Sequence, residues 1–127
     1  MLDYEQLRAL NECVDTTFGR SSIRDAGHAV HCKILNGMDD THILEIRFES
    51  IVTTHPHKIE STKQEYDDVS IKALNEEIKK IKADFKDMTG KTLNATKGNH
   101  SSRMDIYSYS PSVARGRYFN TIEYKLK

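Results

Sequence analysis

Five histidines and a cysteine in the first half of the chain are the residues that could bind a metal ion. On a β-strand, His28 and Cys32 would point to one face and His31 to the other, so the segment HAVHC cannot close around a single ion. His28 and His42 could meet only if they came from paired strands, and no ligand spacing marks such a site. We therefore expect no metal and no cofactor. The six candidates are His28, His31, Cys32, His42, His55 and His57.

The segment Gly90-Lys91-Thr92 is similar to the end of a phosphate-binding loop. The complete motif needs a glycine five residues before the Gly-Lys pair, and Phe85 stands there instead. The motif must also precede a helix, whereas this segment follows one. The GxSxG, HExxH and paired CxxC patterns are absent from the sequence as well. We predict that the protein is not an enzyme, although a catalytic pair formed only in the fold would leave no sequence pattern.

The last quarter of the chain interleaves basic and aromatic residues. On a sheet, such residues can stack on bases and neutralise phosphates, as proteins that bind single-stranded nucleic acid do. They would serve equally well as anchors of a protein interface. Strands also favour aromatic residues, and sheet edges favour charge, without any binding role. The candidate binding residues are Arg103, Tyr107, Tyr109, Arg115, Arg117, Phe119 and Lys125.

Charge is distributed unevenly along the chain, although its net value is zero. Residues 1–77 contain 15 acids and 8 bases, whereas residues 89–127 contain 7 bases and 2 acids. This asymmetry suggests a basic region that meets a polyanion or an acidic partner surface, or two copies whose opposite ends complement each other. A pI near 7.0 weighs against a typical nucleic-acid-binding domain.

Length and composition favour one domain that covers residues 1–127, because two separate cores would each be marginal. No apolar run approaches the length of a membrane-spanning helix. Acids near the start of the chain stand where a signal peptide would carry bases. We expect a soluble protein that is not secreted and that lies in the cytoplasm or in a virion. Its cysteines, Cys13 and Cys32, are then expected to be reduced.

A long amphipathic helix is predicted over residues 67–89. Its hydrophobic residues recur at intervals of three and four, which places them on one stripe. Asp67 or Asp68 can cap its start, and Gly90 is suited to a left-handed stop. The stripe is too short for a coiled coil and is expected to pack on a sheet. Its members are Ile71, Leu74, Ile78, Ile81, Phe85 and Met88.

Two further segments alternate between hydrophobic and polar residues, which is typical of antiparallel hairpins. They are residues 28–53 and residues 103–126. In the second hairpin, the alternation turns Met104 and Ile106 toward the core. It leaves three aromatic residues on the opposite face, namely Tyr107, Tyr109 and Phe119.

The rest of the chain is predicted to be one short helix and three connections. The helix lies within residues 1–19, with Asp3 as its cap. Residues 20–27 are predicted as a polar connector, residues 54–66 as a long polar crossover and residues 91–102 as a polar loop.

The order α-β-β-α-β-β predicts an α+β domain with a mainly antiparallel sheet of two hairpins and the long helix on one face. The lack of catalytic motifs and the polar loops suit a small structural protein. We expect it to dock into a larger complex through protein contacts or self-association, for example in the virion of a tailed phage. The alternative is a protein that binds single-stranded nucleic acid, such as RNA, through the last hairpin.

Overall fold

The structure is a computed structural model that describes residues 2–14, 20–24, 27–38 and 41–127, with residues 20–24 described by their backbone. Its elements in chain order are α1 (Tyr4–Val14), β1 (Arg20–Arg24), β2 (His28–Asn36), β3 (His42–Thr54), the 3-10 helix η3 (Pro56–Lys58), α2 (Ile59–Thr89), β4 (Ala95–Tyr109) and β5 (Ala114–Leu126).

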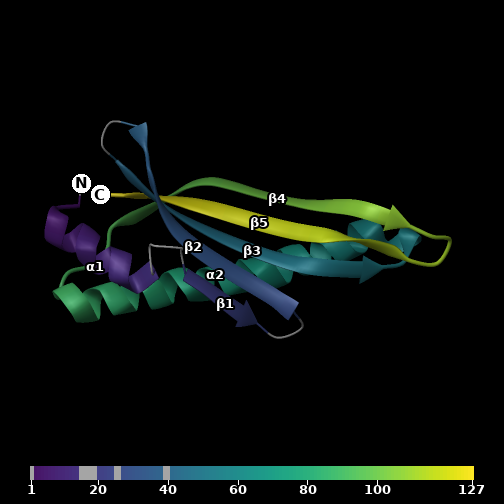
Figure 1. Cartoon of the computed structure of the whole chain (residues 1–127), viewed down its shortest axis with the longest axis horizontal. Helices are drawn as coiled ribbons and strands as arrows, with labels where there is room; N and C mark the ends of the chain where they lie inside the picture. The colour runs from purple at the N-terminus through teal and green to yellow at the C-terminus, as the bar shows by residue number, and fades with distance from the viewer. Residues whose placement is uncertain (1, 15–19, 25–26, 39–40) are drawn as a thin grey trace.

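The described strands form one antiparallel sheet in the order β1-β2-β3-β5-β4. The two predicted hairpins, β2–β3 and β4–β5, are joined because β3 pairs with β5. Helix α2 runs along one face of this sheet, and α1 lies beside the C-terminal end of α2 (Figure 1). The predicted α+β class, the element order and the packing of the helix on the sheet are confirmed, with β1 as an additional strand.

The core lies between the helices and the sheet face that α2 covers, here called the helix side. Burial of large side chains such as Phe48, Ile81 and Phe85 contributes about 1.5–3 kcal/mol each to stability. The core cluster also takes in Leu10 and Val14 of α1, so the short helix extends the same core.

Helix α2 begins at Ile59, so the prediction of a polar crossover over residues 54–66 was wrong. Pro56 starts η3, where its missing N–H is no cost, and η3 leads directly into α2. The first two turns of α2 are mostly solvated, which explains why they carry no hydrophobic pattern. Asp67 therefore lies inside the helix and is not its cap.

The predicted stripe of α2 is right in its middle and wrong at its ends. The four central residues, from Leu74 to Phe85, are buried, but Ile71 is 43% exposed and Met88 is 48% exposed. Ser70 takes the buried place at the N-terminal side because it hydrogen-bonds to polar groups of β5. Gly90 ends the helix as predicted, with φ 72° and its N–H bonded to the Lys86 carbonyl. None of the helices that the structure describes has an apolar stretch long enough to cross a membrane.

The start of α1 is capped as predicted. The Gln6 N–H donates to the Asp3 carboxylate at 2.8 Å, and the Asp3 N–H donates to the Gln6 side chain at 3.1 Å. This reciprocal pair is a capping box. The helix reaches Val14, and the rest of its predicted range, residues 15–19, lies outside the described residues.

Two predicted connections are edge strands instead. Residues 20–24 form β1, which pairs with β2, and residues 95–102 are the first half of β4, which pairs with β5. Most residues of β4 are exposed, and its register shifts at Lys97/His100 and at Ile106/Ser108. Exposure removes the hydrophobic alternation by which a strand is recognised, and the shifts interrupt its period of two.

Gly116 of β5 lies where β4 and β5 approach closely, next to the second register shift. A Cβ atom there would clash with the backbone carbonyl of Asp105. Gly116 is thus a buried strand residue that allows close contact between two strands.

Candidate interaction surface

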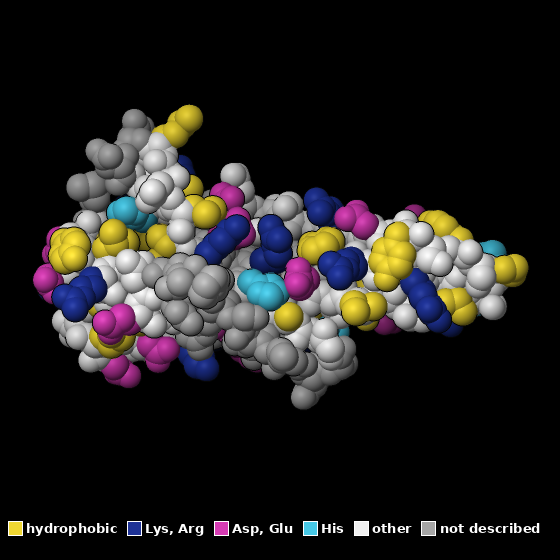
Figure 2. All heavy atoms as spheres, in the orientation of Figure 1, with side chains coloured by type: hydrophobic (Ala, Val, Ile, Leu, Met, Phe, Trp, Pro, Cys, Tyr) yellow, Lys and Arg dark blue, Asp and Glu magenta, His cyan; other side chains and the backbone are white. Residues whose placement is uncertain are grey.

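The sheet face opposite α2, here called the open face, has no described helix over it. Buried residues on β5 alternate with exposed or half-buried ones, and the latter lie on the open face. Cross-strand neighbours share a face, so the partners of these residues on β3 and β4 lie there too. Figure 2 looks onto this face and shows basic and hydrophobic side chains next to one another over β3, β4 and β5.

Five of the seven predicted binding residues lie on the open face. The β5 residues are on it because they alternate with buried Gly116, Tyr118 and Asn120. Arg103 of β4 is on it because it pairs with a β5 residue of this face. The structure brings together Arg103, Arg115, Arg117 and Phe119, with Lys125 farther along β5.

The two predicted tyrosines are placed by the register shift near the end of β4. Tyr107 is the extra residue of the shift, beside Ser108, which pairs with Arg115. Tyr109 pairs with buried Ala114 and therefore shares the helix side of the sheet. The predicted placement of Tyr109 on the face of Phe119 was wrong, because one extra residue reverses the alternation. Both tyrosines are still about two-thirds exposed, at 65% and 66%.

Arg103 and Phe119 form the centre of the open face. The Arg103 guanidinium lies over the Phe119 ring, 4.8 Å from its centroid, and its Nε donates to Asp105 at 3.0 Å. A guanidinium held over an aromatic ring is attracted by the negative ring face. The carboxylate and the ring therefore fix the direction in which Arg103 points.

A shallow hollow of about 330 Å³ opens beside this pair. It brings a second guanidinium, that of Arg47 on β3, to the same place as Arg103. Hydroxyl groups complete its wall, so it offers several hydrogen-bond donors to an anionic or polar group. Its lining residues are Arg47, Ser101, Ser102, Arg103, Phe119 and Thr121. Arg47 was not predicted as a binding residue, although its alternation with buried Ile46 and Phe48 could have placed it on this face.

The acids of the open face neutralise its bases unevenly. Glu45 lies 3.6 Å from Lys33 and 3.8 Å from Arg47, and Glu49 lies 2.9 Å from His31. Among the residues that the structure describes, none forms an ion pair with Arg115 or with Arg117. Two open-face bases without an ion pair to a described residue, Arg115 and Arg117, therefore lie toward the hairpin turn between β4 and β5, whereas Lys125 is a third one at the other end of β5.

The exposed hydrophobic residues of the open face gather at the hairpin-turn end. Ile51 pairs with Arg117 across β3 and β5 and is 64% exposed. We call Ile51, Arg115 and Arg117 of the open face, together with Tyr107 of the adjacent register shift, the distal patch. Ile51 was not predicted as a binding residue. The sequence does mark it, because Ile51 is a hydrophobic residue at a position of β3 where the alternation calls for a polar one.

A buried polar cluster on the helix side holds β5 against α2. The Tyr118 hydroxyl donates to the Asp67 carboxylate and lies 3.0 Å from the Ser70 hydroxyl. The Asn120 amide nitrogen donates to the Ser70 hydroxyl at 2.7 Å. The Asn120 amide oxygen lies 2.7 Å from His100 Nε2 and accepts from it in the tautomer that carries the proton on that nitrogen. Tyr118 and Asn120 are buried, so these hydrogen bonds satisfy groups that water cannot reach.

In this cluster the Tyr118 phenol stays protonated and the Asp67 carboxyl stays ionised at neutral pH. Burial, followed by the hydrogen bond to Asp67, raises the pKa of Tyr118 to about 12. Burial opposes ionisation of Asp67, but hydrogen bonds from Tyr118 and Lys63 outweigh it and lower the pKa of that carboxyl. At neutral pH the phenol donates and the carboxylate accepts. This arrangement is a structural tie and supplies no base at a solvent-exposed surface.

The histidines occupy separate sites. His28 lies 2.7 Å from the Ser50 hydroxyl and stacks against Phe48, whereas His42 is at the other end of the β2–β3 ladder. The two therefore cannot share an ion. The rings of His55 and His57 stack at 5.0 Å, and His55 caps η3. Within the described parts of the chain, no three His, Cys, Asp or Glu side chains are grouped so as to hold a metal ion.

Fold and surface together define an α+β protein with one helix-covered and one open sheet face. Comparisons with protein-family models, with curated proteins and with solved structures found no match for this chain.

Proposed function

We propose that this protein is a small, non-enzymatic assembly protein that docks onto a protein partner through the distal patch. The observation that carries this proposal is the juxtaposition of exposed Ile51 and Tyr107 with two arginines that have no described ion-pair partner. Tyrosine and arginine are enriched among the residues that dominate interface energies, and they act best beside hydrophobic contacts.

The partner surface that fits this patch carries carboxylates next to apolar side chains. Arg115 and Arg117 would pair with the carboxylates, and Ile51 would bury its exposed side chain against the apolar part. Such charge complementarity sets orientation and speeds association. The setting that we propose is a larger particle, such as the virion of a tailed phage, and the small size and mixed fold are what support that setting.

Single-stranded nucleic-acid binding is the second candidate, and the hollow between Arg47 and Arg103 favours it. Two guanidiniums beside an aromatic ring suit a phosphate and a base. Against it stand the carboxylates of Glu45, Glu49 and Asp105, which share the open face. Binding of an oligonucleotide that weakens steeply with added salt would favour this candidate, and no binding at low salt would exclude it.

The docking proposal predicts that replacing Ile51, Tyr107 and Arg117 together with alanine abolishes recovery of the partner with the tagged protein. Each side chain is exposed, so the free energy of unfolding should change by about 0.5 kcal/mol or less per site. Urea denaturation would verify that the variant folds.

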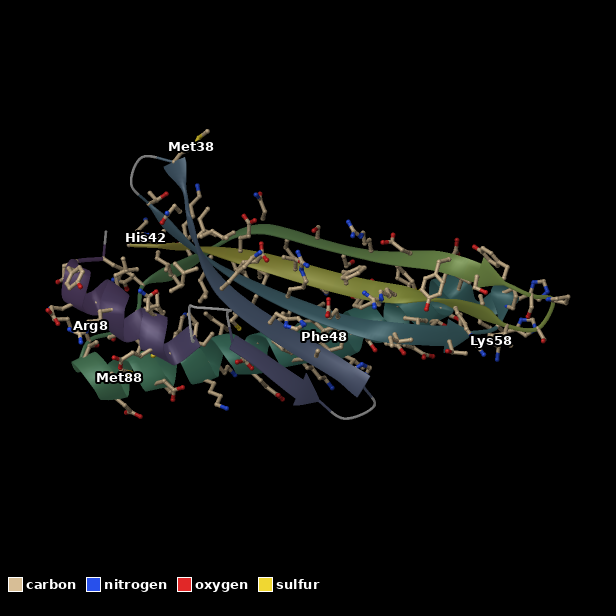
Figure 3. The ribbon with its side chains drawn as sticks, viewed as in Figure 1. Arg8, Met38, His42, Phe48, Lys58 and Met88 are labelled. Carbon is tan, nitrogen blue, oxygen red and sulfur yellow. The ribbon has the colours of Figure 1, made fainter. Side chains whose placement is uncertain are left out.

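The matched control replaces Tyr4, Arg8 and Met38, which are exposed residues at the opposite end of the molecule. In Figure 3, Arg8 and Met38 lie far from Lys58, which marks the end that carries the distal patch. The control variant should recover the partner as the wild type does. Equal recovery by the two triple variants would refute the proposal, and a second copy of the chain as the recovered partner would identify self-association.

A further inference from the structure

A second hollow lies between the side of α2 and β4, away from the open face. Its volume is about 350 Å³. Three lysines from two elements line it: Lys79 and Lys82 of α2 and Lys97 of β4. Asn75 and Tyr124 add a side-chain amide and a phenol to its wall.

Local structure explains why these groups converge. Asn75, Lys79 and Lys82 are spaced by four and three residues, which places them on one line of the helix. Lys97 pairs with Tyr124, a buried residue of β5, and so lies on the helix side, facing α2. The register shift follows directly after Lys97 and separates this part of β4 from the regular part beyond it.

The positive charge in this hollow has no counterpart in the described structure. No carboxylate lines it, and among the described residues none forms an ion pair with Lys79, Lys82 or Lys97. Lys79 and Lys82 are also three residues apart on a helix, a spacing at which like charges repel. An anion placed between the three ammonium groups would relieve that repulsion.

Tyr124 gives this hollow an additional hydrogen-bond donor. Its side chain is buried, and its hydroxyl makes no hydrogen bond to another residue that the structure describes. Burial raises the pKa of Tyr124, so the phenol keeps its proton at neutral pH. A phenol that lines a positively charged hollow can donate to an oxygen of a bound anion.

We propose that this hollow binds the phosphate groups of a small organic phosphate ester of about nucleotide size. Lysine binds phosphate as a mobile point charge, and hydrogen bonds to an ionised acceptor are stronger than neutral ones. Ile78 and Ala95 complete the lining with apolar surface for the organic part. The volume is within the range of small-molecule sites, about 300–1,000 Å³. This site shares no residue with the distal patch.

The test is isothermal titration calorimetry of the full chain with adenosine triphosphate, inorganic tripolyphosphate and adenosine. The two phosphate compounds should bind, and adenosine should not. A double variant, Lys79→Gln with Lys97→Gln, should bind about tenfold more weakly or worse, because two charge-assisted contacts are lost. The control, Lys33→Gln with Lys58→Gln, removes the same net charge elsewhere and should bind as the wild type does.

Tyr124→Phe isolates the hydroxyl, because it removes one hydrogen-bond donor and leaves the charge unchanged. Its affinity for tripolyphosphate should fall by about three- to tenfold. Tighter binding of adenosine triphosphate than of tripolyphosphate would assign the organic part to the site, and equal affinities would assign the phosphates alone. Absence of binding by both phosphate compounds, or equal affinities of the two double-lysine variants, would overturn the proposal.

Discussion

At the scale of single residues, the contact between Tyr118 and Asp67 connects α2 with the centre of the sheet. Tyr118 is a buried residue of β5 on the helix side of the sheet, between Arg117 and Phe119 of the open face. Its ring also packs against Phe48 and Tyr66, so its position depends on both layers. Loss of the hydroxyl would leave the Asp67 carboxylate without one of its donors, at a cost of about 1–3 kcal/mol.

Tyr118→Phe should therefore lower the free energy of unfolding at pH 7 and lower it less at pH 11. The pKa of Tyr118 is raised to about 12 in the folded protein, above the ordinary value of 10.0. The unfolded chain consequently loses this proton first as the pH rises, and the wild type loses stability between about pH 10 and pH 12. The phenylalanine variant has no such loss.

Urea denaturation of the two proteins at both pH values measures this difference. Tyr4→Phe, at an exposed tyrosine, is the control and should match the wild type throughout. A stability gap between wild type and Tyr118→Phe that stays constant from pH 7 to pH 11 would contradict the assignment.

At the scale of elements, the burial of the stripe residues of α2 shows which of them contact the sheet. Ile81→Ala should cost about 2–5 kcal/mol, because Ile81 is fully buried and its removal leaves a cavity. Ile71→Ala is the matched control from the same predicted stripe. Since Ile71 is 43% exposed, its truncation should cost much less. Thermal or urea unfolding of both variants measures the two costs, and similar values would contradict the orientation of the helix.

The middle of α2 and the strand pairs were predictable because burial leaves a period in the sequence. Leu74 to Phe85 follow the helical period, and buried residues of β3 and β5 follow the period of two. The start of α2 and the first half of β4 face water and carry no such period. Nothing local in the sequence could therefore distinguish them from loops.

The candidate surface was predictable to a similar extent. Alternation in the last hairpin placed Phe119 correctly on the face opposite the core. It misplaced Tyr109, because a register shift inserts one residue into β4 and no sequence pattern marked that shift. The pairing of Arg117 with Ile51 depends on which strand lies beside β5, and strand order is a property of the whole sheet.

At the scale of the whole molecule, the two ends of the sheet differ. β2 pairs with β3 only up to Glu49, so beyond that point the distal end consists of β3, β5 and β4 over the first turns of α2 (Figure 1). The hydrophobic and unpaired basic residues of the distal patch lie on this narrower end. Helix α1 and the end of β5 lie at the other end.

Site-specific photocrosslinking tests the proposed docking role most directly. A photoreactive amino acid would replace Ile51 or Tyr107 in the distal patch and, as controls, Tyr4 or Met38 at the opposite end. These side chains are all exposed, so each probe can reach a bound protein. In the cells or particles that contain this protein, we expect one discrete adduct from each distal position and none from the controls. Adducts of equal yield from both ends, or from the control positions alone, would contradict the assignment of the distal patch as the docking surface.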